Sequence, residues 1–157
     1  MHLQNSHANP LNKFGKKCFS QSDEDGITLE ILRRIKKVDQ GLFVELGVGD
    51  GTENNTLLLL SLGWKGFWIG GNELAFKTRK NERFTYFKKW ITAENILEIF
   101  AKGMKLLKEK EIDLISVDLD GNDYYILKTL LQSKILPNVF ILEYNAKFPP
   151  PIKFKSC

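Results

Sequence analysis

Short apolar runs alternate with longer amphipathic stretches along most of the chain, and this alternation is typical of an α/β protein. The apolar runs predict five strands, at residues 42–46, 66–69, 84–87, 112–117 and 139–142. These runs have too few polar positions to leave one face in water. The predicted sheet is therefore mostly parallel, with helices on both faces.

The amphipathic stretches between the runs predict the helices. They are expected at residues 22–37, from about 52, at 73–80, at 92–108 and from 122 onward. The first has an acidic first turn at 23–25 and a basic last turn at 33–37, which suits the helix dipole at both ends. Residues 1–19 are expected to form a polar N-terminal arm, and residues 20–157 are long enough for one domain with one core.

Composition narrows the function classes. Hydrophobic residues make up 43% of the 157 residues and charged residues 27%, as in a folded domain. No apolar run is long enough for a membrane span and no signal peptide begins the chain, so a cytoplasmic protein without membrane contact is expected. Cys18 and Cys157 lack the spacing of a zinc site or disulfide framework. The net charge of +4 comes from scattered lysines, so nucleic acid is not expected as a partner.

The clearest chemical signal follows the first predicted strand. Ligands of parallel sheets bind outside the carboxyl ends of the strands. There the chain has an acid and then alternating glycines, Glu45-x-Gly47-x-Gly49-x-Gly51. Dinucleotide sites use GxGxxG, which rests a pyrophosphate on a helix N-terminus, whereas GxGxG lets the backbone pass beneath a nucleoside that has no phosphate. S-adenosylmethionine is such a ligand. A tight turn is the alternative for the glycines alone.

Three stretches together resemble the FkbM-like branch of Rossmann-fold methyltransferases. They are SQSDEDGI at 20–27, FVELGVGDG at 43–51 and DLISVDLDGNDY at 113–124, and Glu143-Tyr144-Asn145 is also similar. The resemblance spans roughly Cys18 to Pro151. It implies a Rossmann-like, doubly wound fold and S-adenosylmethionine as cofactor. It also implies O-methylation of a hydroxyl on a sugar or secondary metabolite, so the expected partner is a small-molecule or glycan acceptor.

The resemblance also implies roles for individual residues. Cofactor contacts are expected from Gln21, Glu45, Gly47, Gly49, Gly51, Glu73, Thr92, Ala93 and Asp118. Thr92 and Ala93 would lie near the adenine, and Gln21, with Asp25, near the methionine end. Helix capping is the alternative for the acidic cluster that contains Asp25.

Asp120 is the expected general base, because it lies two residues beyond Asp118 at the tip of the fourth strand. In an extended segment both carboxylates would point the same way, and two like charges raise one pKa. The only histidines, His2 and His7, lie in the arm. A Ser-His-Asp hydrolase is therefore not expected, and the proton acceptor is expected to be a carboxylate, tyrosine or lysine.

Two departures from the resembling family affect these expectations. The second strand ends in Gly70-Gly71 where an acid usually grips the ribose, and Glu73 is the nearest carboxylate that could replace it. The resembling fold also adds two strands after the fifth, so the sheet is expected to be truncated there. An open fifth-strand edge predicts self-association.

The cluster Asp118, Asp120, Asn122 and Asp123 is similar to the start of a calcium loop. The similarity fails at Asp123, where such loops need glycine, and at Thr129, where they need glutamate, so no metal is assigned. A divalent ion on two of these carboxylates remains one alternative, and a helix cap beside a cofactor-facing acid is the other.

The sequence thus predicts a methyltransferase domain. Its rivals are a non-catalytic binding or interaction module and, disfavoured by glycine spacing, a dinucleotide-dependent oxidoreductase.

Overall fold

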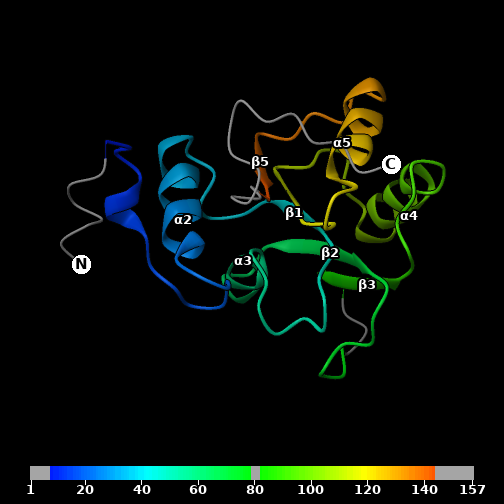
Figure 1. Cartoon of the computed structure of the whole chain (residues 1–157), viewed down its shortest axis with the longest axis horizontal. Helices are drawn as coiled ribbons and strands as arrows, with labels where there is room; N and C mark the ends of the chain where they lie inside the picture. Colours follow the sequence, from blue (N-terminus) through cyan, green and yellow to red (C-terminus); the bar gives the residue numbers. More distant parts are fainter. Residues whose placement is uncertain (1–7, 79–81, 144–157) are drawn as a thin grey trace.

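Five parallel strands form the centre of the protein. The computed structural model describes residues 8–78 and 82–143. Its strands are β1 (Leu42–Leu46), β2 (Lys65–Gly70), β3 (Phe84–Lys88), β4 (Leu114–Val117) and β5 (Val139–Leu142). They pair in the order β3-β2-β1-β4-β5, as Figure 1 shows. The predicted α/β, Rossmann-like sheet is therefore confirmed. Its strand order reverses direction between β1 and β4.

Helices cover both faces of this sheet. They are η1 (Asn12–Phe14), α2 (Glu24–Arg34), α3 (Leu57–Ser61), α4 (Ile96–Leu107) and α5 (Asp123–Gln132). In Figure 1, α2 and α3 lie on one side of the strands and α4 and α5 on the other. Among the described residues, no helix has both the length and the apolar character that crossing a bilayer requires.

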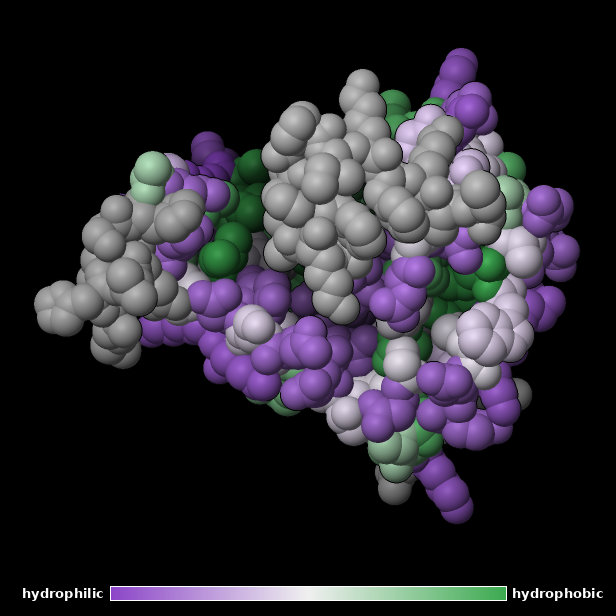
Figure 2. Space-filling model, in the orientation of Figure 1, coloured by the Kyte–Doolittle hydropathy of each residue, from purple (hydrophilic) through white to green (hydrophobic). Residues whose placement is uncertain are grey.

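Two hydrophobic clusters hold the layers together, and β1 contributes to both. Val44 and Leu46 pack with residues of α4 and α5, whereas Phe43 packs with Leu32 of α2 and Leu59 of α3. Alternate side chains of a strand point to opposite faces, so a central strand that is buried throughout must be apolar on both. In Figure 2, hydrophilic side chains cover most of the visible rim of the molecule, and hydrophobic ones show mainly between them.

Two predicted helices differ in the structure. The helix expected from about Thr52 begins only at Leu57. The helix expected at 73–80 is wrong for residues 73–78, which are not helical. There the Ala75 N–H donates to the Asp50 carbonyl at 2.8 Å, and the Phe76 ring meets Trp68 edge to face at 6.3 Å. Tertiary contacts thus outweigh the helical pattern of this short segment.

The described part of the N-terminal arm lies against α2. The Gly26 N–H donates to the Lys16 carbonyl at 3.0 Å, and a Cβ at Gly26 would lie 2.1 Å from the Phe14 oxygen. The buried Asp25 carboxylate accepts the N–H groups of two arm residues, Cys18 and Phe19, and of the adjoining Ser20, at 2.6–2.9 Å. Asp25 therefore ties residues 18–20 to α2. This role is structural, but it is not the helix cap given as the alternative, because the three N–H groups lie before the helix.

At the other end of the order, β5 pairs with β4 and with no other described strand. The expected self-association through this edge stays a prediction, because residues 144–157 lie outside the described part. Sedimentation of the full chain over a concentration series would test it: a monomer at all concentrations would contradict it.

Candidate functional site

Two adjoining cavities lie at the carboxyl ends of the strands. The large cavity, of about 720 Å³, lies between the 47–55 loop, the start of α2 and the ends of β4 and β5. The small cavity, of about 240 Å³, lies between the ends of β1, β2, β3 and β4. Gly47, Gly49 and Asp118 line both. The cavities therefore meet where the strand order reverses, which is where ligands bind in open α/β sheets.

The three glycines of the loop after β1 have different roles. Gly47 lets two loops meet, because a Cβ there would lie 1.7 Å from the Asp118 carbonyl oxygen. Gly51 lies beneath the 74–76 segment, where a Cβ would be 2.9 Å from the Leu74 side chain, and it lines neither cavity. Gly49 has a positive φ of +55°, and a Cβ at this position would meet no other atom within 4 Å. Of the three, Gly49 is the one that leaves open space for a ligand.

The Glu45 side chain accepts its hydrogen bonds from the loop that follows its own strand. Its carboxylate accepts the N–H groups of Asn55 at 2.9 Å and Thr56 at 3.1 Å, and the Thr56 hydroxyl at 2.5 Å. Burial raises the pKa of Glu45, and the hydrogen bonds from Thr56 and Asn55 oppose that rise. These N–H groups lie at the start of α3, where a bound phosphate would need donors. Glu45 therefore already satisfies the N–H groups of Asn55 and Thr56 just before α3, so they are not available to a phosphate.

The large cavity is strongly acidic. Six carboxylate residues line it: Glu24, Glu45, Asp50, Glu53, Asp118 and Glu143. Among its described lining residues there is no lysine or arginine, although the chain as a whole carries +4. Lys17 approaches the edge, where its ammonium lies 3.5 Å from Glu53. A wall of this kind attracts a cation and repels an anion.

Three carboxylates gather where the two cavities meet. Oxygens of Asp118, Asp120 and Glu143 lie within 4.8 Å of one another. Burial, and then the charge of Asp120, raises the pKa of Asp118. Burial, and then the charge of Asp118, raises the pKa of Glu143. The group has the chemistry to accept a proton, to face a cationic ligand or to hold a divalent ion.

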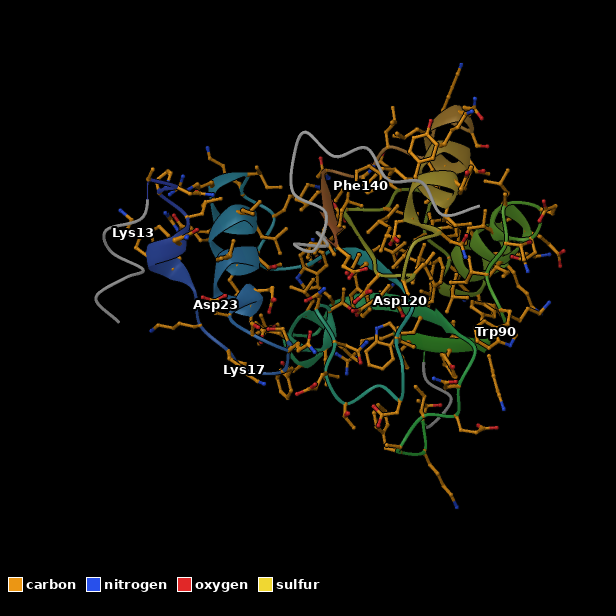
Figure 3. All side chains as sticks on the ribbon, viewed as in Figure 1. Lys13, Lys17, Asp23, Trp90, Asp120 and Phe140 are labelled. Atoms are coloured by element: carbon orange, nitrogen blue, oxygen red, sulfur yellow. The ribbon has the colours of Figure 1, made fainter. Side chains whose placement is uncertain are left out.

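The expected proximity of Asp118 and Asp120 is therefore correct, but the reason given for it is not. The strand ends at Val117, and Asp120 has a left-handed backbone with φ of 50°. The turn is held by Asp123, whose carboxylate accepts the Leu119 N–H at 2.9 Å and the Gly121 N–H at 3.0 Å. A tight turn, not strand alternation, brings the two acids together. Figure 3 shows Asp120 near the middle of the molecule.

Of the other predicted cofactor residues, some line the cavities and others do not. Gln21 lines the large cavity. Glu73 lines neither cavity; it is 81% exposed and forms an ion pair with Lys88. Asn72 lies at the end of β2 instead, with its carbonyl held by the Tyr86 hydroxyl at 2.5 Å. Sequence reasoning missed Asn72 because it searched that position for a carboxylate.

Thr92 and Ala93 are also outside both cavities. Thr92 and Asn95 exchange side-chain and backbone hydrogen bonds at 3.0 and 3.3 Å and form the turn that begins α4. The neighbouring Trp90 and Ile91 line the small cavity in their place. The available signal was a tryptophan three residues after the third predicted strand, in a loop at the ligand-binding edge. Tyr144 and Asn145, part of the last similar motif, lie outside the described residues.

No family model matches the chain, and no curated protein is significantly similar to it. The residues and their geometry therefore carry the functional argument.

Proposed function

We propose that this protein binds S-adenosylmethionine across the two cavities and transfers its methyl group to a hydroxyl of a small molecule or glycan. The observation that carries the proposal is the acidic wall of the large cavity, joined to the small cavity beside Gly49. S-adenosylmethionine pairs an uncharged nucleoside with a cationic sulfonium and ammonium. Its charge matches the large cavity, and it needs no phosphate donors.

In this proposal the small cavity holds the adenosine. Gly70, Gly71 and Asn72 line it at the end of β2, and Asn72 takes the place of the usual ribose-binding acid. The methionine end lies in the large cavity, between Gln21, Asp118 and Glu143. When bound, the cofactor supplies an electrophilic methyl group, and positioning accounts for most of the catalysis.

Asp120 is the proposed general base. It lines the small cavity beside Asp118. Together with Asp118 and Glu143 it forms the cluster of three carboxylates. An acceptor hydroxyl must lose a proton as it takes the methyl group, and a nearby carboxylate can accept that proton. The two carboxyl groups beside it, Asp118 and Glu143, have pKa values that are raised by burial and then by neighbouring charge.

A dinucleotide-dependent oxidoreductase is disfavoured because Glu45 already accepts the N–H groups at the start of α3. A non-catalytic binding module is the second candidate. It is favoured by one observation: Glu73, the carboxylate expected to grip the ribose, is paired with Lys88 outside the cavities. Such a module would bind the cofactor without turnover.

Calorimetry of the full chain tests the proposal with three ligands: S-adenosylmethionine, its demethylated product S-adenosylhomocysteine, and NAD. Binding of the first two and much weaker binding of NAD are expected. Tight NAD binding without a signal from the other two would contradict the proposal. Release of S-adenosylhomocysteine with hydroxylated acceptors then separates an enzyme from a binding module.

A further inference from the structure

Trp90 is exposed to a degree that its packing does not explain. It is 79% exposed, the highest value among the large hydrophobic side chains of the described residues. The other two tryptophans, Trp64 and Trp68, are fully buried. Trp90 nevertheless lines the small cavity, between the glycines of β2 and the turn after β4. A broad apolar surface is therefore offered to whatever enters that cavity.

The backbone around Trp90 is fixed although the indole is exposed. The N–H of the preceding Lys89 donates to the Gly70 carbonyl at 2.8 Å. The Asn95 side-chain amide donates to the Trp90 carbonyl at 2.8 Å. The ring is thus presented from an anchored loop, at the β3 side of the sheet as Figure 3 shows. Little ordering is needed for the indole to meet a ligand.

Gly71 sets the orientation of the ring. A Cβ at Gly71 would lie 2.9, 3.0 and 3.1 Å from Cε2, Cδ2 and Cζ2 of Trp90. Three ring atoms at nearly equal distance indicate that a face of the indole, not an edge, covers this glycine. Gly71 has no positive φ, so the close approach of the ring is what requires glycine here.

We propose that Trp90 is the positioning residue for a planar heterocyclic base in the small cavity, and that it stacks on that base. The inference rests on the proposed function, which places the adenine there. A purine has an uncharged π-face and little hydrogen-bonding need across that face, so an indole is a suitable partner. Gly70 and Gly71 add no side chain of their own to the cavity: a Cβ at Gly70 would lie 2.9 Å from the Val48 side chain, and the indole already covers Gly71.

Fluorescence quenching by acrylamide tests this in the full chain, because Trp90 is the exposed tryptophan of the three. Adenosine and S-adenosylhomocysteine are expected to protect Trp90 from acrylamide, whereas methionine alone is not. Trp90→Phe should remove the quenchable emission and so identify its source. An unchanged quenching constant with saturating adenosine would overturn the inference.

Calorimetry with S-adenosylhomocysteine supplies the second readout. Trp90→Ala should weaken binding by about tenfold or more, as loss of one stacked aromatic does. Trp90→Phe should restore most of the affinity, because it keeps a ring. Gly71→Ala should also weaken binding, since its methyl group displaces the indole. Tyr124→Ala is the control: this tyrosine is 52% exposed and lines neither cavity.

The outcomes separate the two proposals. Full affinity in Trp90→Ala overturns the role of Trp90 and leaves the proposed function standing. Protection by adenosine without any binding of S-adenosylhomocysteine or S-adenosylmethionine supports base stacking and contradicts the proposed function. If neither adenosine nor S-adenosylhomocysteine binds the wild-type chain, the inference is overturned together with the function on which it rests.

Discussion

The two ends of the sheet carry similar numbers of charged groups but arrange them in opposite ways. At the amino end, a cavity of about 370 Å³ is lined by Lys37, Lys65 and Arg83 together with Glu109, Glu111 and Asp113. Four of these six residues form ion pairs: Lys37 lies 3.0 Å from Asp113, and Lys65 lies 2.5 Å from Glu109. Such pairing is what structural charges need when they leave water.

At the carboxyl end, acids lie beside acids. Asp118, Asp120 and Glu143 share one small volume, and burial and mutual repulsion raise the pKa values of Asp118 and Glu143. A fold gains nothing from that repulsion, so the arrangement is better explained by a ligand that it serves. The pairing of charges, more than their number, thus separates the carboxyl end of this sheet, with its candidate site, from the amino end.

The largest effect is expected where a side chain would enter the carboxyl-end cavities. Gly49→Asn should weaken binding of S-adenosylhomocysteine on the order of 100-fold or more, because the side chain would fill space that a ligand needs. Asparagine tolerates the positive φ of Gly49, so the protein should still fold. Calorimetry and circular dichroism measure the two effects.

Gly63→Asn provides the matched control for Gly49. Gly63 also has a positive φ, of +96°, but lies in the turn before β2 at the other end of the sheet. Its variant should bind S-adenosylhomocysteine normally. Unchanged affinity in Gly49→Asn would mean that the loop after β1 is only a turn.

The next largest effects divide the acidic cluster. Asp120→Asn should keep cofactor affinity and lose turnover by a factor on the order of 100, because it removes the proposed base. Asp118→Asn should weaken cofactor binding itself. Both constants are measured with any acceptor that the wild type methylates, and Asp39→Asn, at the amino end, serves as control. Full turnover in Asp120→Asn would reduce this residue to part of the turn.

The sequence predicted the sheet well but the site only in part. Strands are revealed by their own burial pattern, whereas the site depends on contacts between distant segments. The strands could be found because a run such as 42–46 is buried on both faces, and all of its residues except Glu45 are apolar. The sequence placed Glu45 in the region of the site, but it did not predict which groups donate hydrogen bonds to its carboxylate. Residue spacing does not reveal that the backbone at Asn55 and Thr56 folds back onto Glu45. The false helix at 73–78 and the missed Trp90 have the same origin. Both depend on contacts between segments distant in the chain.

A structural acid at the amino end should affect stability and not binding. Asp113 is buried, and its carboxylate accepts the Leu42 N–H at 3.0 Å and the Asn138 amide at 2.9 Å. Asp113→Asn should lower the free energy of unfolding by about 1–3 kcal/mol, because donors lose an acceptor in a buried place. Urea unfolding measures it. Glu109→Gln, which breaks only the exposed pair with Lys65, should cost below about 1 kcal/mol. Equal costs would contradict the expected difference between the buried carboxylate of Asp113 and the exposed one of Glu109.

The smallest expected effect is a gain in the free energy of unfolding, in contrast to the loss expected for Asp113→Asn, and it depends on pH. Because the pKa of Glu143 is raised in the folded protein, ionising it opposes folding, and the wild type loses stability as pH rises through that raised pKa. Glu143→Gln should therefore stabilise the protein at pH 7, by less than about 1 kcal/mol because solvent screens this exposed group. The gain should vanish near pH 4, where the wild-type carboxyl is protonated as well. Urea unfolding at both pH values checks this.

Glu111→Gln is the control. Glu111 lines the amino-end cavity, and its charge helps to raise the pKa of Lys37 after that of Asp113, so this variant should not stabilise the folded protein. A Glu143→Gln variant that is less stable at both pH values would show that the carboxylate is held by favourable contacts, and that the two ends of the sheet are built alike.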